Sequence, residues 1–309
     1  VSLRKRGWDH VNFTMVGAVA GVGKIMRLGE DKLRHALALA VVPHAAMRQT
    51  RAGELSMWKG AAAANACRNA VFACMLAENG MTGPSQPFEG EMGFFKQVSG
   101  EPFTLEQLPR TPEMVLKTYL KYHPVEYHAM TAVDAALKIA RQVSAKQITE
   151  VRVDTFEASY TILAKDVEKW RPTTRETADH SLPYIVAATL LDGGVWLDSF
   201  TPERISRSDV REFMARVRVY EDQALTARYP GELPNRVSVK LADGKRLDAE
   251  EAIPRGHYKN PMTDEEVRAK FNRLTSRLLT EEKQRQIVET VERFEKLDSV
   301  DEFVEVLVK

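Results

Sequence analysis

The chain has 309 residues, 44% of them hydrophobic, and its 44 Lys and Arg residues are balanced by 43 Asp and Glu residues. At roughly 100–200 residues per domain this length predicts about two domains, and a net charge of +1 excludes the overall basic field that recruits nucleic acid or an anionic membrane. No apolar stretch reaches the roughly 18 residues of a membrane span, and Cys67 and Cys74 lie too far apart along one predicted helix to form a disulfide, which favours a reducing cytosol.

Helical patterns dominate the first third of the chain. Apolar residues recur at helical spacing in residues 12–28 and 30–42, and an alanine-rich helix is predicted over residues 58–79. Because small residues occupy all faces of this third helix, we expect it to be a central helix in a crowded bundle. A further helix is predicted to begin at Thr111-Pro112, with proline in its first turn.

The pattern changes at about residue 148. Three stretches alternate apolar and polar residues as strands do, and Asp243-Gly244 in the last of them is a strong hairpin signal. The predicted strands lie in residues 148–156, 216–220 and 235–250, with helices near residues 157–168, 180–192 and 207–215. After Pro261, a capping box of Thr263 and Glu266 opens a helical stretch that continues to the end of the chain.

These elements predict a fold that is mainly α with an α+β part. Residues 1–118 and 259–309 are expected to form two parts of one all-helical domain, and residues 119–258 an α+β lid domain inserted between them. A glycine-rich stretch at residues 17–24, GAVAGVGK, resembles a phosphate-binding loop, but Ala18 replaces a required glycine and Ile25 replaces the required Ser or Thr. Its glycines are therefore predicted to be helix-packing positions.

Lys59 is the candidate functional residue with the clearest physical argument. It opens the alanine-rich helix, where the helix dipole is unfavourable for a cation and where free N–H groups can bind an anion. Burial there would lower its pKa toward the range useful for proton transfer. The loop before it carries His44, Arg48 and Arg51, and a solvated basic loop explains either arginine alone equally well.

Three other stretches gather titratable side chains just before predicted helices or where the chain leaves the predicted lid. Their residues are Lys121, His123, Glu126 and His128 in the first, Asp179, His180 and Tyr184 in the second, and Arg255, His257 and Lys259 in the third. A lone histidine at a helix start is usually a capping or core residue. Clustering of this density is instead typical of functional sites, and domain junctions are favoured places for pockets.

Five stretches together resemble the MmgE/PrpD family, which includes 2-methylcitrate dehydratase and cis-aconitate decarboxylase. In chain order they are GWDHVN, LSMWKGAAAANACRNAVF, KYHPVEYHAMTAVDAAL, TRETADHSLPYIVAATLLDGG and PRGHYKNPMTDEEVRAKF. The resemblance covers essentially the whole chain. It implies an all-helical domain with an inserted α/β lid, an active site between the two that uses neither metal nor cofactor, and a homodimer.

The resemblance also implies roles for individual residues. The candidate catalytic residues are Lys59, Lys121, His128, His180 and Tyr184, and the candidate substrate-binding residues are His10, Arg48, Arg51, Glu126, Arg255 and His257. Lys59 and Lys121 would hold carboxylates, His128 or His180 would exchange a proton, and Tyr184 would donate to the leaving oxygen. A histidine of the decarboxylase branch falls at Glu126 here, which favours the dehydratase branch.

The expected function is dehydration of a small tricarboxylate such as 2-methylcitrate, in cytoplasmic propionate metabolism. An isomerase, epimerase or decarboxylase of another polycarboxylate is an alternative, and so is a non-catalytic helical dimer scaffold. Family members carry a further N-terminal helical segment with an aspartate and a histidine of the site, which would precede Val1. That segment is expected to be cleaved, unobserved or supplied by another chain, unless the protein is a degenerate member.

Overall fold

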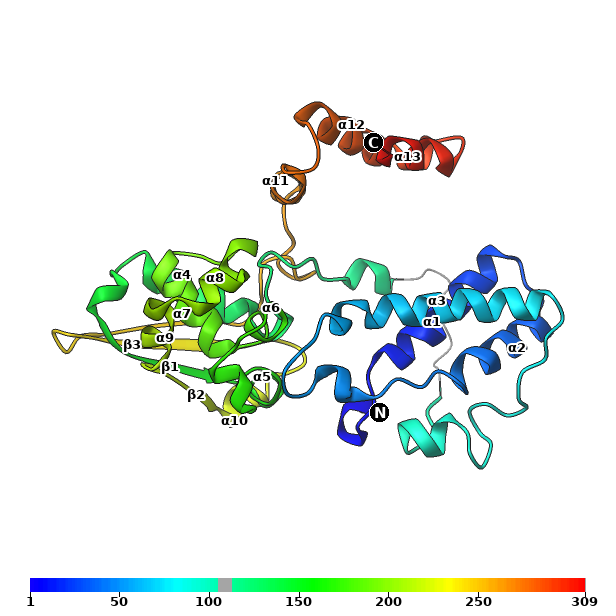
Figure 1. The fold of residues 1–309 in the computed structure, drawn as a ribbon, viewed down its shortest axis with the longest axis horizontal. Coiled ribbons are helices and arrows are strands. Elements are labelled where there is room, and N and C mark those ends of the chain that lie inside the picture. The colour runs from blue at the N-terminus through cyan, green and yellow to red at the C-terminus, as the bar shows by residue number, and fades with distance from the viewer. Residues whose placement is uncertain (105–112, 309) are drawn as a thin grey trace.

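The computed structural model describes residues 1–104 and 113–308. It consists of a helical unit, an α/β unit and a C-terminal helical arm (Figure 1). The fold is therefore mainly α with an α+β part, as the sequence predicts. The predicted helix start at Thr111-Pro112 lies outside the described residues. The first described element after it is a short 3₁₀ helix, Met114–Lys117.

The helical unit contains the three helices predicted for the first third of the chain. They are α1 (Val11–Ile25), α2 (Glu30–Val41) and α3 (Trp58–Glu78). Alanines of α3 pack against Met15 and Val19 of α1 and against Ala36 of α2. A Cβ added at Gly23 would lie 2.5 Å from Leu33 Cδ1, so this glycine allows α1 to approach the chain at α2 closely. The prediction that the glycines are helix-packing positions is confirmed for Gly23, but it is wrong for Gly17 and Gly21, which are exposed and where an added Cβ would meet nothing within 4 Å.

Only one face of α3 is covered by the described residues. Ala66, Ala70 and Ala73 are buried, whereas Trp58 and Phe72 are 52% and 57% exposed. Within residues 1–104 and 113–308, α1 and α2 both contact the alanine-rich face of α3. The expectation that α3 is surrounded by other helices is therefore wrong for the part of the chain that the structure describes.

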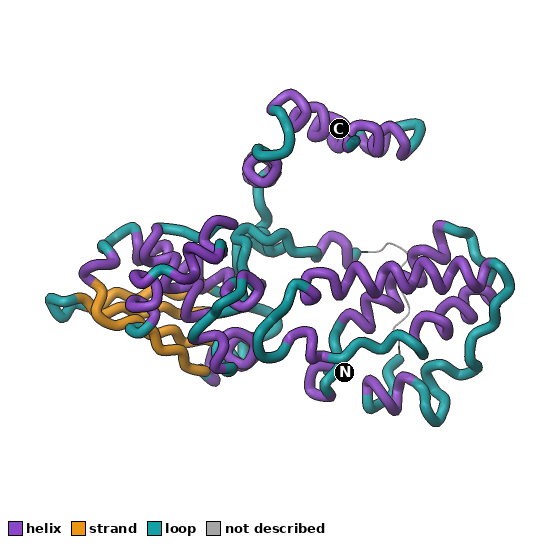
Figure 2. The backbone as a smooth tube through the Cα atoms, in the orientation of Figure 1, coloured by secondary structure: helices purple, strands orange, loops and turns teal. Residues whose placement is uncertain are grey.

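The α/β unit is built on a four-stranded sheet with the order β2-β1-β3-β4. Its strands are the orange segments in Figure 2. Its strands are β1 (Ile148–Thr155), β2 (Val217–Glu221), β3 (Asn235–Leu241) and β4 (Arg246–Glu251). Strands β1 and β2 are parallel, and the other neighbours are antiparallel. The predicted hairpin joins β3 to β4 through Gly244, whose φ of +86° suits glycine.

Helices cover one face of this sheet. Those of the α/β unit are α4 (Met130–Ala140), α5 (Glu157–Leu163), α6 (Arg175–Ala178), α7 (Leu182–Asp192), α8 (Pro202–Ser206), α9 (Ser208–Met214) and α10 (Gln223–Thr226). Apolar residues of α4, α7 and α9 form the main core with alternate residues of the strands, such as Val151 and Val237. The remaining residues of the strands project from the opposite face.

The C-terminal arm contains α11 (Asp264–Thr275), α12 (Glu281–Glu292) and α13 (Val300–Leu307). The predicted capping box begins α11, because Thr263 and Glu266 accept each other's backbone N–H groups. Arg273 lies 3.9 Å over the ring of Trp196 and connects the arm to the α/β unit. Figure 1 shows the arm apart from α1–α3, so the joining of residues 1–118 and 259–309 into one domain stays a prediction.

Candidate functional site

The beginning of α3 is held against the α/β unit. The backbone N–H of Leu55 donates to Thr177 Oγ1 at 3.1 Å, and Thr174 Oγ1 donates to the carbonyl of Leu55 at 3.3 Å. Thr174 and Thr177 cap and form α6. These contacts fix the loop before α3, and Figure 1 shows the N-terminal end of α3, whose first turn contains Lys59, on the side of the helical unit toward α6.

Charged residues from both units surround Lys59. Burial lowers the pKa of Lys59, and the charges of Lys121 and Arg51 lower it further, while the carboxylates of Asp179 and Glu126 raise it. Charges have such effects only over short distances, so these side chains share one neighbourhood. The structure thus brings together five groups that come from three separate stretches of sequence.

Two histidine–carboxylate pairs lie on the α/β side of this neighbourhood. Glu126 and Asp179 belong to different loops, which are joined because the N–H of Glu126 donates to the carbonyl of Asp179 at 2.9 Å. Nδ1 of His128 lies 2.9 Å from Glu126 Oε1, and Nδ1 of His180 is hydrogen-bonded to Asp179 Oδ1. A carboxylate acceptor places the proton on Nδ1, which leaves Nε2 of each neutral ring with its lone pair.

The two pairs are electrostatically coupled. Burial lowers the pKa of His180, although the hydrogen bond and charge of Asp179 oppose the shift. Burial alone would raise the pKa of Glu126, but the charge and hydrogen bonds of His128, with the charge of His180, lower it to about 2. At neutral pH the site therefore contains a neutral His180 beside an ionised Glu126, a combination suited to proton transfer next to fixed charge.

A hydrogen bond to the backbone of His128 and two aromatic rings beside its imidazole hold this residue in place. The side-chain amide of Asn235, at the start of β3, donates to the carbonyl of His128 at 2.9 Å. The imidazole lies 5.5 Å from the ring of Phe156 and 5.8 Å from that of Tyr229, measured between centroids. These contacts leave the ring little freedom to rotate.

The helical unit contributes a second charged group. Arg51 Nε donates to Asp9 Oδ2 at 2.8 Å, and Asp9 is buried. His10 lies beside them, with Nδ1 3.2 Å from Asp9 Oδ1. Desolvation and the charge of Arg51 lower the pKa of His10, and Lys59 adds to this effect. His10 and Arg51 therefore belong to the same neighbourhood as Lys59.

Arg48 lies at the edge of this group. It opens the short 3₁₀ helix Arg48–Arg51, and burial followed by the charge of Arg4 lowers its pKa, while Asp166 and Asp9 raise it. The charge of Asp9, which binds Arg51, therefore also acts on Arg48, together with the charges of Arg4 and Asp166.

Tyr184 is not brought to the site, which corrects the expectation that it donates to a leaving oxygen. It is fully buried in the core of the α/β unit, and its hydroxyl donates to the carbonyl of Ser199. Burial raises its pKa to about 12, and the charges nearest to it are those of Arg204 and Asp192. Nearly all of α7 is buried, so its pattern could not tell which face the tyrosine occupies.

Arg255 and His257 also have other partners. Arg255 binds Glu266 through Nε and Nη2 and Asn260 through Nη1, which fixes the start of α11. His257 is 1% exposed and is stacked on Tyr119 at 4.3 Å, and its Nδ1 accepts the N–H of Lys259. Both residues act in the connection between the α/β unit and the arm, and the expected contact with substrate finds no support in their contacts.

Sequence reasoning missed two lysines near the site. Lys169 is only 2% exposed, and burial lowers its pKa while Asp179 and Glu126 are among the carboxylates that raise it. Burial and the charge of Lys121 lower the pKa of Lys270, which comes from α11. Both lysines lie in runs of alternating charge that are typical of a solvated helix face, so the local pattern did not indicate burial near a site.

Comparison with known proteins agrees with this arrangement of units. Residues 1–106 match the MmgE/PrpD N-terminal domain, and residues 123–296 match the MmgE/PrpD C-terminal domain. The chain is 29% identical over 263 residues to a probable 2-methylcitrate dehydratase of Saccharomyces cerevisiae, which covers 80% of this chain and 50% of that protein.

Two further relatives show the breadth of the similarity. The 2-methylcitrate dehydratase-like protein oryR of Aspergillus oryzae is 31% identical over 331 aligned positions, which cover 98% of this chain and 64% of that protein. The cis-aconitate decarboxylase of Homo sapiens is 25% identical over 300 aligned positions, which cover 92% of this chain and 59% of that protein. The chain thus spans about half to two thirds of the length of these relatives.

Proposed function

This chain belongs to the MmgE/PrpD family, and we propose that it carries side chains with which a lyase dehydrates a small tricarboxylate such as 2-methylcitrate. The observation that supports this most is the meeting of Lys59, Lys121 and Arg51 with the Asp179–His180 and Glu126–His128 pairs. There the two lysine amines and the arginine guanidinium share one neighbourhood with two imidazoles, and the Nδ1 atom of each imidazole is hydrogen-bonded to a carboxylate.

The cations would bind the carboxylates of the substrate. A tricarboxylate carries about three negative charges at neutral pH, and removal of a proton beside a carboxylate adds further negative charge. Lys59, Lys121 and Arg51 are placed to offset that charge, and interactions that strengthen as charge develops lower the barrier. In this proposal they do so without a metal ion.

The imidazoles would move the protons. Neutral His180, oriented by Asp179, takes the proton from the carbon next to a carboxylate through Nε2. The electron pair of that C–H bond forms the C=C double bond and the C–O bond breaks. The departing hydroxide takes the Nε2 proton of the imidazolium form of His128, which becomes the neutral imidazole, and leaves as water. In this proposal His128 replaces Tyr184 as the proton donor, because the tyrosine lies in the core.

Several features remain predictions that accompany this proposal. They are the use of 2-methylcitrate in propionate metabolism, the cytoplasmic location and the homodimer. Among the described residues, no helix combines the length and the apolar character needed to cross a bilayer.

Proton NMR of product mixtures tests the function. The chain is incubated separately with 2-methylcitrate, citrate and cis-aconitate, and 2-methylcitrate is expected to lose water to an alkene. Lys59→Met should reduce this turnover about 100-fold or more, whereas Lys24→Met, at an exposed position of α1, should leave it unchanged. Thermal melting confirms that both variants are folded.

Each other result has a definite meaning. Unchanged 2-methylcitrate with the wild-type chain contradicts the dehydratase proposal. Release of CO₂ from cis-aconitate would replace it with decarboxylation. Turnover that survives Lys59→Met would remove Lys59 from the mechanism.

A further inference from the structure

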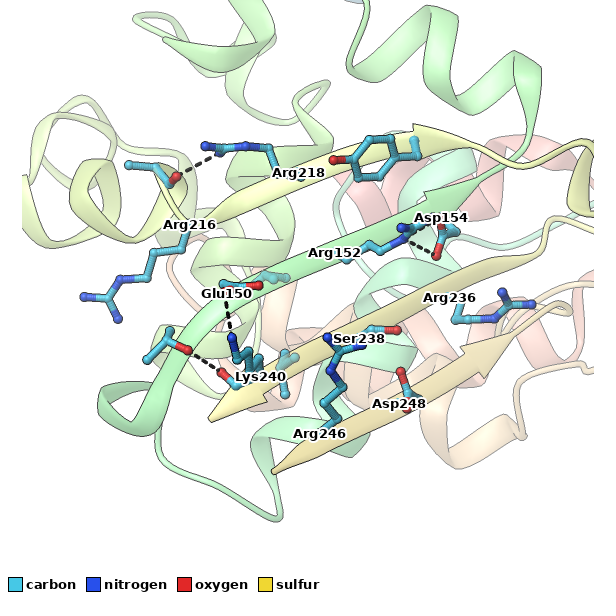
Figure 3. Close-up of a pocket in the computed structure, with 15 residues that line it drawn as sticks. Glu150, Arg152, Asp154, Arg216, Arg218, Arg236, Ser238, Lys240, Arg246 and Asp248 are labelled. Atoms are coloured by element: carbon cyan, nitrogen blue, oxygen red, sulfur yellow. Dashed lines mark hydrogen bonds and ion pairs between the residues drawn. The ribbon is translucent and has the colours of Figure 1, made fainter. Parts of the chain in front are cut away.

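The uncovered face of the sheet is a second charged surface, distinct from the candidate site. It forms an open depression of about 830 Å³ lined by side chains of all four strands (Figure 3). Helices α4 and α7 pack on the opposite face, against β3, β4 and β2. Nothing in the proposed dehydration uses the depression.

The charge on this face is uneven along the strands. The register sets Glu150 of β1 opposite Lys240 of β3, and Lys240 opposite Arg246 of β4, at the end of the sheet where β1, β2 and β4 begin. The cations at this end, called the basic end below, are Arg216, Arg218, Lys240 and Arg246. Its acidic residue is Glu150, which lies 3.2 Å from Lys240.

The register also sets like charges next to each other. Lys240 is opposite Arg246, and Arg152 of β1 is the partner of Arg218 of β2. Like charges on directly neighbouring strand positions destabilise a sheet. Arg152 is drawn away from Arg218, because it binds Asp154 at 2.8 Å and lies over the ring of Tyr220 (Figure 3).

The two ends of this face differ in whether their cations are paired with carboxylates. At the far end, Arg236 is paired with Glu250 at 2.8 Å. Within residues 1–104 and 113–308, no carboxylate lies within ion-pair distance of Arg216, Arg218 or Arg246. Arg216 and Arg218 each donate one nitrogen to backbone carbonyls of the chain, which leaves further N–H groups available.

We propose that the basic end binds small molecules that carry a chain of phosphate groups. Guanidinium groups recognise phosphate through paired N–H donors, and Lys240 adds a further positive charge. Neighbouring strands lie about 4.8 Å apart, so Lys240 of β3 and Arg246 of β4 can contact neighbouring phosphates. Arg218 lies on β2, on the far side of β1, and can contact a phosphate further along the chain of phosphate groups. The open, polar depression suits a hydrophilic polyanion better than an apolar ligand.

The candidate site lies toward the other end of the sheet. Asn235, which holds the carbonyl of His128, is the first residue of β3, whereas Lys240 is near its last. The two sites therefore use different residues, and variants can separate them.

Calorimetric titration of the chain with tripolyphosphate and with ATP tests the proposal. The wild-type chain is expected to bind both, more weakly as salt rises. The double variant Arg218→Gln/Arg246→Gln should raise the dissociation constant about tenfold or more. Arg236→Gln, which removes a paired arginine from the far end, should change it less than about twofold.

Two further variants complete the test. Lys59→Met should keep tripolyphosphate binding, because it belongs to the other site. Arg218→Lys/Arg246→Lys keeps the charge and should retain part of the affinity, which checks the result if the glutamine variant fails to fold. Tighter binding of ATP than of tripolyphosphate would identify nucleotides as the ligands, and equal binding would identify the phosphate chain alone.

Three outcomes would overturn the proposal. They are no heat of binding for the wild-type chain at millimolar ligand, equal weakening by Arg236→Gln, and loss of binding in Lys59→Met.

Discussion

His180 and Asp179 show how the fold sets a proton-transfer group. Burial of the imidazole favours its neutral form, and the adjacent carboxylate limits that shift while fixing the Nδ1 proton. A histidine in water would be partly protonated near its ordinary pKa of 6.5. In the folded chain the base form extends to lower pH.

The pH dependence of turnover tests this assignment. Because the folded pKa of His180 is lowered, kcat/KM should fall only as pH drops through a value below 6.5. Asp179→Asn removes the charge that raises this pKa, so the acid limb should move to still lower pH. Asp134→Asn, which removes the separate His123–Asp134 pair, is the control. An unmoved limb in Asp179→Asn would exclude His180 as the base.

The stability of the fold in acid depends on Glu126. Its pKa is about 2 in the folded chain against 4.5 as its ordinary value, so folding favours the ionised carboxylate and the ionised form stabilises the fold. Since the folded pKa is the lower one, this contribution is complete above pH 4.5 and is lost as pH falls toward 2.

Urea unfolding at several pH values measures this contribution. Glu126→Gln should be destabilised relative to wild type at pH 7, and the difference should shrink below pH 4.5, where the carboxylate of the unfolded wild-type chain takes up a proton while that of the folded chain is still ionised. Glu203→Gln, at an exposed position of α8, should show no such convergence. A constant difference between Glu126→Gln and wild type across this range would contradict the assigned pKa.

Sequence reasoning predicted much of the candidate cluster, whose role in catalysis stays a prediction. Lys59, Lys121, Glu126, His128 and His180 were predicted from their clustering near helix starts and from family resemblance, and the structure brings them together. The position of Tyr184 could not be predicted, because α7 is apolar around most of its surface. The burial of Lys169 could not be predicted either, because its neighbours Asp166 and Glu168 make the stretch resemble a solvated charged surface, and the nearby Asp179 and Glu126 come from other segments.

The start of α7 positions His180. Ser181 is the N-cap residue, and its hydroxyl accepts the N–H of Tyr184 at 3.1 Å and donates to the carbonyl of Lys169. This one buried side chain therefore joins the helix start to the 3₁₀ helix Val167–Trp170. Both elements contribute residues near Glu126 and Asp179.

Removing this cap should affect stability and binding together. Ser181→Ala should lower the unfolding free energy by about 1–2 kcal/mol and weaken tricarboxylate binding, because it loosens the turn that carries His180. Thr280→Ala removes the N-cap of α12 in the arm and should leave binding unchanged. Urea unfolding and calorimetry measure the two effects, and unchanged binding by Ser181→Ala would show that the cap does not position the site.

Strands were easier to predict than helix breaks. The alternation of residues 236–241 matches the burial of β3 residue by residue, because one face of the sheet is covered and the other is open. Asn235 is the exception, because it is polar and buried. The helix predicted over residues 157–168 instead ends at Leu163. Trp170 then donates its ring N–H to the carbonyl of Ala164 at 2.7 Å, a tertiary contact that helical periodicity does not report.

Two distant parts of the chain cross where the arm begins. The N–H of Leu120 donates to the carbonyl of Gly256 at 2.8 Å. Gly256 has a φ of +92°, and a Cβ there would lie 1.8 Å from the carbonyl oxygen of Leu120. Only glycine allows this approach. The crossing also sets the loop that leads to Lys121.

Gly256→Ala should therefore destabilise the chain by about 2 kcal/mol or more, from backbone strain and the clash together. Gly194→Ala is the control, because its Cβ would meet nothing within 4 Å. Urea unfolding compares the two, and equal effects would mean that the crossing adjusts at little cost.

At the scale of the whole molecule, the order of helices, α/β unit and helices was predictable, whereas the placement of the last helices was not. Periodicity defines α11–α13, but their partners depend on surfaces that periodicity does not specify. Arg255–Glu266 and Arg273–Trp196 connect the arm to the α/β unit, and Lys270 of α11 lies near Lys121. The junction of units is thus also the place where the candidate site forms.

Calorimetric titration with 2-methylcitrate tests most directly whether this junction is a tricarboxylate site. The wild-type chain and Lys24→Met should bind with the same affinity, whereas Lys59→Met and Lys121→Met should each bind about tenfold or more weakly. Equal affinity of all four proteins, with both site variants folded, would contradict the convergence of charges on which the account depends.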